Sequence, residues 1–396
     1  MNTAGFTPWT DRLTDRKYKR IADSVNTITP RLFIAATQQN DGKTTSALGL
    51  FSVLKKRLGR IGFIKPVGQR FVDVDGKRID EDSLLIDRTF SVQTPIEDMS
   101  PIAIEPDFTR RYIDNANNEH LVRRLQNSFD RACWEKEFCI IEGTGHAGVG
   151  SVFDLSNAKV ARLLGSKVLL VTKGGIGKPI DEVALNKALF DLEGVELAGV
   201  IINKILPEKY DFVKDFCQRG LARLGIEMLG AMPDEPILSN PTLNEICKQV
   251  RGRFVNSRSE AHRKVERTII GAMNSSHVME EFTPGTLVVT PGDREDIILA
   301  ALSTTALMEP QTKGLTGLIL SGDLLPHPTV LNLISQSALP VIASPMDSYS
   351  VANAIHTMTI KTLPGDYEKI HRIQEMVEQY IDVDRLMEKI GMRAKA

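Results

Sequence analysis

The chain alternates short apolar runs with longer amphipathic stretches from Arg31 onward. Short apolar runs are typical of strands buried on both faces, and apolar positions spaced by three or four residues predict helices. In the first half we expect strands over 32–36, 60–67, 138–141, 167–172, 197–202 and 227–231, with helices near 118–134, 179–193 and 208–224 between them. This order predicts an α/β fold, a parallel sheet with helices on both faces.

A second and smaller α/β unit is expected in the later part of the chain. Strands over 287–290, 317–320 and 339–343 alternate there with helices over 297–307, 329–335 and 350–358. Between the two units lies the basic segment 248–267, with Ala261, Val265 and Ile269 on one helical stripe. A solvated helix face is favoured there over a nucleic-acid surface, because Glu260 and Glu266 lie among the cations. The predicted organisation is an N-terminal extension over 1–30 with a short helix near 15–24, a first domain over 31–240, a linker or helical segment over 241–282, a second domain over 283–365, and C-terminal helices over 366–396.

The last predicted helix carries an apolar stripe of Ile370, Ile373, Val377 and Ile381. Such a stripe must be covered, either by its own domain or by another subunit. We therefore hypothesise that residues 283–396 mediate self-association and that the protein is a homo-oligomer.

Composition restricts the classes of partner. The 396 residues are 42 % hydrophobic and 25 % charged with a formal net charge of −1, so no global field favours nucleic acid or membrane. The apolar runs are far too short to cross a membrane. The four cysteines lack metal-ligand spacing and no signal-type segment follows Met1, so a cytoplasmic location is expected.

A phosphate-binding pattern lies between the first strand and the helix that follows it. Gly42-Lys43-Thr44 is the second half of G-x-x-x-x-G-K-[ST], with Thr37 in the place of the first glycine. Gly42 lets the backbone approach a phosphate, Lys43 reaches the terminal phosphates, and Thr44 can ligate Mg²⁺. ATP and Mg²⁺ are therefore the predicted cofactors. The expected nucleotide contacts from this loop are Thr37, Asn40, Asp41, Gly42, Lys43, Thr44 and Thr45.

Polar residues that close other strands are further candidates, because ligands of such sheets bind beyond the carboxyl ends of the strands. Glu142 could bind Mg²⁺, and Lys65 could contact a phosphate or an anionic substrate, although a surface lysine is the alternative. Asn203 could bind a base edge or serve only as a turn residue. Asp82 opens a helical pattern, and on periodicity alone it is a helix cap.

The runs ATQQNDGKTT, IKPVG, DEDSLLI, IIEGTG and GVIIN resemble dethiobiotin synthetase in content and order over residues 31 to about 235. That family uses Mg-ATP to phosphorylate a carbamate. The resemblance implies that Lys43 and Lys65 stabilise phosphoryl charge, that Thr44, Asp82 and Glu142 hold Mg²⁺, and that Asn203 binds adenine. The chain departs from the family pattern in three places: Asn40 replaces an acidic residue inside the phosphate-binding loop, Val67-Gly68-Gln69-Arg70 replaces the substrate-binding segment after Lys-Pro, and His146 lies in the Gly-rich segment after Glu142.

KPVGQ and the segment from Met273 to Leu302, with its TPGDR motif, resemble the N-terminal half of long bacterial phosphotransacetylases. In those proteins a dethiobiotin-synthetase-like domain precedes a DRTGG domain, a regulatory and assembly module. The chain ends at Ala396, so we expect no acetyl transfer. No cysteine follows Cys247, which argues against a glutaminase domain like that of cobyrinic acid diamide synthase. Two hypotheses remain, an ATP-dependent ligase-like enzyme or ATPase acting on an unknown small carboxylate or carbamate, and a nucleotide-sensing regulatory protein.

Overall fold

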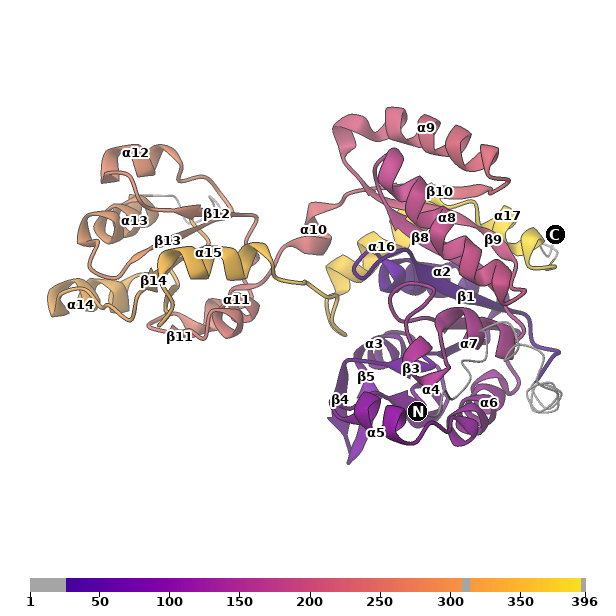
Figure 1. Cartoon of the computed structure of the whole chain (residues 1–396). Coiled ribbons are helices and arrows are strands. Elements are labelled where there is room, and N and C mark those ends of the chain that lie inside the picture. The colour runs from indigo at the N-terminus through magenta and orange to yellow at the C-terminus, as the bar shows by residue number, and fades with distance from the viewer. Residues whose placement is uncertain (1–25, 308–313, 393–396) are drawn as a thin grey trace, which may run out of the picture. The chain divides into compact units, whose positions relative to one another are not determined.

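The computed structural model describes residues 26–307 and 314–392, which divide into two compact units (Figure 1). Unit 1 comprises the described residues up to Asp234 and those from Thr362 onward, and unit 2 is Glu235–Lys361. Unit 2 is therefore inserted into the chain of unit 1. The helix expected near 15–24 lies outside the described residues.

The core of unit 1 is a six-stranded sheet in which every neighbouring pair is parallel. Its strands, in spatial order, are β10 (Met228–Pro233), β9 (Leu197–Ile205), β8 (Lys167–Lys173), β1 (Arg31–Ala36), β7 (Phe138–Glu142) and β2 (Ile61–Ile64). All residues of β1 are buried, as the uninterrupted apolar run predicts for a central strand. The predicted parallel α/β fold is confirmed.

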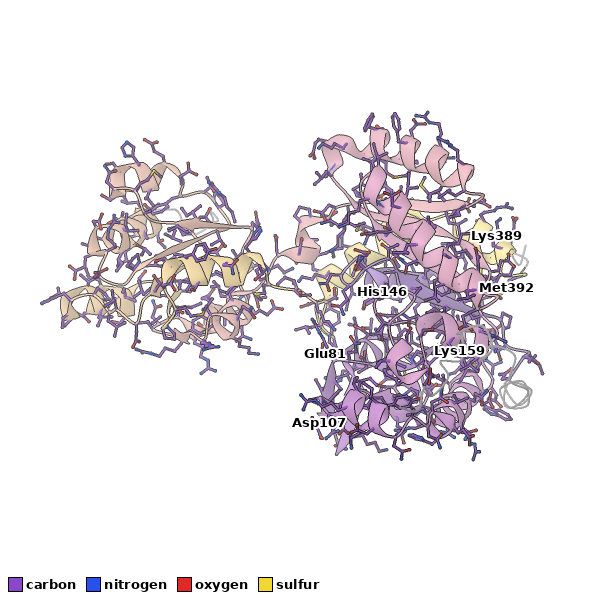
Figure 2. The ribbon with its side chains drawn as sticks, in the orientation of Figure 1. Glu81, Asp107, His146, Lys159, Lys389 and Met392 are labelled. Atoms are coloured by element: carbon purple, nitrogen blue, oxygen red, sulfur yellow. The ribbon has the colours of Figure 1, made fainter. Side chains whose placement is uncertain are left out.

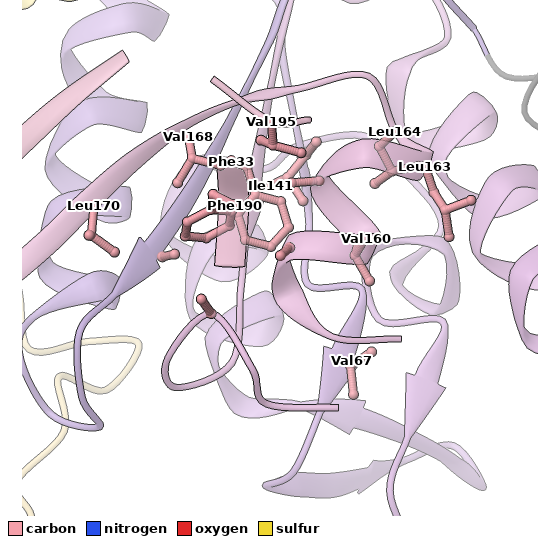
Figure 3. Close-up of a cluster of buried hydrophobic side chains, with 14 of the residues drawn as sticks. Phe33, Val67, Ile141, Val160, Leu163, Leu164, Val168, Leu170, Phe190 and Val195 are labelled. Carbon is pink, nitrogen blue, oxygen red and sulfur yellow. The ribbon is translucent and has the colours of Figure 1, made fainter. Parts of the chain in front are cut away.

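Helices cover both faces of this sheet. One face packs on α6 (Glu119–Cys133), α7 (Asn157–Leu163), α8 (Gly177–Leu192) and α9 (Tyr210–Arg223). Phe33 from β1 and Phe190 from α8 meet in the resulting core, shown in Figure 3. Helix α2 (Lys43–Leu58) packs against β1 and β7 but contributes no residue to this core, so it lies on the opposite face. The smaller elements of unit 1 are β3 (Val67–Gly68), β4 (Phe71–Val74), β5 (Lys77–Asp80), α3 (Glu81–Phe90), α4 (Ile96–Met99), β6 (Ile102–Ala103) and α5 (Phe108–Asp114).

The C-terminal apolar stripe is covered by unit 1 itself. Helix α16 (Tyr367–Tyr380) lies directly on α2, and Ile373 and Val377 are buried at the contact. The approach is so close that a Cβ on Gly49 would lie 2.2 Å from Val377 Cγ2. Helix α17 (Val383–Lys389) follows, and Asp382 N donates to Leu229 O within β10. The stripe therefore gives no support to self-association, because its own unit buries it.

Unit 2 has a five-stranded sheet ordered β11 (Arg253–Phe254), β15 (Val341–Ala343), β14 (Gly317–Ser321), β13 (Thr286–Pro291) and β12 (Arg267–Ile270). Only β11 is antiparallel to its neighbour. The helices of this unit are α10 (Pro236–Ser239), α11 (Leu243–Gln249), α12 (Ser275–Glu280), α13 (Glu295–Leu307), α14 (Pro328–Gln336) and α15 (Ser348–His356). Within the described residues, no helix combines the length and apolar character that a membrane crossing requires.

The helix expected over 248–267 is wrong. That segment instead forms the end of α11, strand β11, a short 3-10 turn and the start of β12. Val265 is buried in the core of unit 2, and a Cβ on Gly252 would lie 2.6 Å from Ile342 Cγ2. Residues 241–282, expected as a linker, therefore supply two edge strands of the sheet, because packing on β15 and β13 outweighs their helical spacing.

Candidate functional site

The turn from β1 to α2 contains two residues in the left-handed backbone region, which favours glycine and asparagine. Asn40 and Gly42 adopt positive φ angles of 65° and 105°. A Cβ at Gly42 would also lie 1.9 Å from Asn203 Nδ2, so position 42 excludes any side chain. Gly42 O accepts the first hydrogen bond of α2, from Ser46 N. The loop thus delivers the N-terminus of α2, a favourable place for an anion, at the carboxyl end of the sheet.

Thr37 and Asp41 fix the shape of this loop from inside. Asp41 Oδ2 accepts from Gln38 N at 2.7 Å and from Thr37 Oγ1 at 2.8 Å. Thr37 Oγ1 also lies 2.8 Å from Thr172 Oγ1 in β8, and both threonines are fully buried. The threonine that replaces the first glycine of the motif therefore ties the loop to the neighbouring strand. Both side chains, predicted to contact nucleotide, are engaged within the protein.

Asn203 lies against the same loop. Its Nδ2 donates to Asp41 O and its Oδ1 accepts from Lys204 N, each at 2.9 Å. Lys204 Nζ donates to Asn40 O, also at 2.9 Å. Lys204 was missed from the sequence, because the direction of its side chain depends on its positive φ of 56°. Asn203 was expected to bind adenine, whereas both ends of its amide here hydrogen-bond to the protein backbone.

A buried charge cluster, made of Lys65, Asp82 and Glu142, lies beside the start of α2. Lys65 Nζ contacts Asp82 Oδ2 and lies 2.8 Å from Glu142 Oε1. Thr44 Oγ1 donates to that same Glu142 oxygen at 2.9 Å. Lys65 directly follows β2, and Asp82, Glu142 and Thr44 lie in α3, β7 and α2. All but half-buried Thr44 are buried. Residues separated by up to 98 positions therefore converge at one end of the sheet, as the strand-end argument predicted.

The cap interpretation of Asp82 is wrong. Asp80 is the N-cap of α3, and its Oδ1 accepts from Asp82 N at 2.9 Å. With the cap supplied two residues earlier, the Asp82 side chain is turned to Lys65. The D-x-D spacing of Asp80 and Asp82 was the available signal, because one acid can cap while the other turns inward.

Lys43 is the first residue of α2 and lies beside the buried charge cluster. It is buried, yet among the described residues it makes no hydrogen bond or ion pair. Burial, and after it the charge of the Lys65 ammonium, lowers the pKa of Lys43 to about 8. Burial likewise disfavours the charged form of Lys65, but Asp82 and Glu142 outweigh this and raise the pKa of Lys65 above its ordinary value. Burial also raises the pKa of Glu142, to about 7, against the opposing effect of Lys65.

The donor set fits a hard divalent cation. Glu142 Oε2 is buried and has no hydrogen-bond partner among the described residues. Asp82 and the Thr44 hydroxyl are the other oxygen donors beside it, a set suited to Mg²⁺ when phosphate oxygens complete the shell. No group of three or more His, Cys, Asp or Glu side chains within the described ranges could hold a metal, so this oxygen set is not a complete protein cage.

A glycine-rich loop after β7 borders the site. Asn157 at the start of α7 holds this loop, accepting from Thr144 N at 3.0 Å and donating to Thr144 O at 2.7 Å. His146 is exposed on it, and its Nδ1 accepts from Gly148 N at 3.2 Å. His146 and Glu81, at the start of α3, are both labelled in Figure 2 and help to locate the site. Thr45 lies half-buried in the first turn of α2.

Two family models match the chain in succession. The AAA domain matches residues 30–242 and the DRTGG domain matches residues 245–358. The predicted order of a P-loop nucleotide domain followed by a DRTGG domain is confirmed. Among solved structures, the MinC:MinD cell division protein complex of Aquifex aeolicus covers 53 % of this chain and 84 % of its own at 16 % identity and a TM-score of 0.33.

Curated relatives are phosphate acetyltransferases. That of Pseudomonas aeruginosa is 28 % identical over 377 residues, which cover 91 % of this chain and 52 % of the relative. That of Nitratidesulfovibrio vulgaris is 26 % identical over 371 residues, covering 90 % and 51 %. The chain spans about half the length of these relatives. These relatives overturn the expectation of a ligase-like enzyme or ATPase that is not a phosphotransacetylase, because nine-tenths of the chain is similar to proteins named phosphate acetyltransferase.

Proposed function

Because the chain belongs to the AAA domain family and carries a DRTGG domain after it, we propose that its AAA domain is the nucleotide-binding regulatory domain of a phosphate acetyltransferase. ATP would bind with Mg²⁺ at the turn from β1 to α2, and its occupancy would regulate acetyl transfer to phosphate. The acetyl-transfer part of the proposal rests on the names of the relatives. The nucleotide part rests on the site.

One observation carries the nucleotide part. Lys43, the first residue of α2, is buried, and the described residues give it no hydrogen-bond or ion-pair partner; they give none to the buried Glu142 Oε2 either. Lys43 would bind the terminal phosphates through charge-assisted hydrogen bonds. Thr44, Asp82 and Glu142 would hold Mg²⁺, which when bound neutralises part of the phosphate charge. Backbone N–H groups from Gly42 onward would complete the phosphate contacts.

Calorimetry of the full chain with ATP and Mg²⁺, at pH 7 and at pH 9, tests this proposal. We expect saturable binding at pH 7 and weaker binding at pH 9, by up to roughly tenfold, because Lys43 with a pKa of about 8 loses its proton between them. Absence of saturable binding at pH 7 would contradict the nucleotide site. Acetyl transfer to phosphate, measured with and without ATP, tests the regulatory role.

The lowered pKa of Lys43 should make ATP affinity fall with pH but the stability of the fold rise with pH, so stability provides a control. Since the pKa of Lys43 is lowered from 10.5 to about 8, the unfolded chain binds more protons between these values. The contribution of Lys43 to the free energy of unfolding therefore rises with pH in that window and is lost as pH falls through 8. Thermal unfolding at both pH values separates weaker binding from loss of the fold.

Asn203→Ala distinguishes base recognition from loop positioning. The amide of Asn203 supports Asp41 O and fills the space next to Gly42. We expect the variant to bind ATP, GTP and inorganic tripolyphosphate more weakly than wild type, with the same loss of affinity for each. The loss should be roughly five- to tenfold, as for one lost buried hydrogen bond. A loss confined to ATP, with tripolyphosphate unaffected, would assign Asn203 to the adenine base. Asn244→Ala, in unit 2, is the matched control.

A further inference from the structure

The buried charge cluster already contains a cation. Lys65 Nζ lies between the two carboxylates, in contact with Asp82 Oδ2 and 2.8 Å from Glu142 Oε1. The lysine side chain is 6 % exposed and that of Glu142 is 0 % exposed, so water replaces neither partner. Two carboxylates in such a place are stable only with positive charge beside them. In this structure the positive charge comes from the protein itself.

The ammonium and a metal ion compete for the same oxygens. Mg²⁺ or Mn²⁺ bound to Glu142 would lie about 2.0–2.2 Å from its oxygen, which brings it to within a few ångströms of Lys65 Nζ. Like charges at that separation repel strongly in a site that excludes water. Glu142 Oε2, which has no hydrogen-bond partner in the described part of the chain, offers a ligand on the other side of the carboxylate, but one oxygen alone is a weak site.

We propose that Lys65 is the resident cation of this site, so that a divalent metal enters only together with the phosphates of a nucleotide. The inference rests on the proposed function and adds how metal binding at this site depends on the nucleotide. Bound phosphates supply the negative charge that gives Lys65 a new partner, and they supply the further oxygens that the metal needs. A metal ion without nucleotide would be repelled by the Lys65 ammonium, which would have no phosphate to bind instead. The site therefore responds to the metal–nucleotide complex and ignores free metal.

Titration of the chain with Mn²⁺ in the absence of nucleotide tests the proposal. Binding is measured as the loss of the electron paramagnetic resonance signal of free Mn²⁺. Mn²⁺ takes the same oxygen ligands as Mg²⁺. We expect no saturable Mn²⁺ binding to the wild-type chain without nucleotide, and binding when ATP is added. Lys65→Met should bind Mn²⁺ without nucleotide, tighter than wild type by roughly tenfold or more. Lys77→Met is the matched control, because it removes an exposed lysine paired with Glu97 at 2.8 Å and should leave Mn²⁺ binding unchanged.

A second variant keeps the test decisive if Lys65→Met folds poorly. Lys65→Met combined with Asp82→Asn removes one buried negative charge together with the positive one, and it should bind Mn²⁺ less tightly than Lys65→Met but more tightly than wild type. Thermal unfolding should show Mn²⁺ raising the melting temperature of both variants and not of wild type. Wild-type binding of Mn²⁺ alone, or no gain in either variant, would overturn the proposal. Wild-type failure to bind ATP would instead contradict the nucleotide site.

Discussion

Lys43→Ala should weaken ATP binding by about 1.5–3 kcal/mol, the worth of a hydrogen bond to a charged group. This corresponds to roughly ten- to a hundredfold in affinity. Lys43 is buried at the start of α2 without a hydrogen bond or ion pair among the described residues, so its removal takes away the cation proposed to bind the terminal phosphates and breaks no polar contact there. Titration calorimetry at pH 7 measures the change.

Lys56→Ala is the appropriate control for that measurement. Lys56 lies in the same helix and makes an exposed ion pair with Glu378 at 2.5 Å, a type of contact that contributes little to stability. Its loss should leave ATP affinity unchanged. Equal affinity of wild type and Lys43→Ala would place the nucleotide elsewhere, while loss of the pH dependence in Lys43→Ala would assign that dependence to this lysine.

Gly49→Ala should destabilise unit 1 by about 1–3 kcal/mol, although alanine is the better helix former by about 1 kcal/mol. The added Cβ would lie 2.2 Å from Val377 Cγ2 and 3.1 Å from Ile373 O, so α16 must move away from α2. The midpoint of urea unfolding measures the loss. Gly177→Ala is the control, because a Cβ at the start of α8 meets nothing within 4 Å.

A double-mutant cycle isolates the contact between the two helices. Val377→Ala alone leaves a cavity and should also destabilise. If the clash is the cause, Gly49→Ala and Val377→Ala together should cost less than the sum of their separate effects, with an interaction energy of about 0.5–3 kcal/mol. Strict additivity would show that α16 does not restrict position 49.

The fold and the location of the site were predictable because both follow from local rules. Buried parallel strands leave continuous apolar runs such as that of β1, and the strand-end rule brought Glu142 and Lys65 together with Thr44. What these residues do to one another was not predictable. Lys65 was expected to face phosphate, yet its neighbours are Asp82 and Glu142, because a buried ammonium takes the nearest carboxylates.

One error and one undecided alternative arose where one periodicity suits two environments. Ala261, Val265 and Ile269 recur at helical spacing, but Val265 enters the core of unit 2 from an extended segment. Ile373 and Val377 do lie on a helix, yet their partner is α2, more than three hundred residues earlier in the sequence. Spacing identifies which face of an element is apolar, and only the tertiary structure identifies what covers it.

The insertion of unit 2 between Asp234 and Thr362 has a consequence for how the protein is made. A chain emerging from the ribosome presents all six strands of the first sheet by Pro233, but α16 is synthesised only after the whole of unit 2. Until then the surface of α2 around Gly49 stays uncovered, and domains of this kind fold as units as synthesis proceeds. Unit 1 should therefore mature late, after unit 2, and chaperone capture should concentrate on nascent chains halted before Thr362.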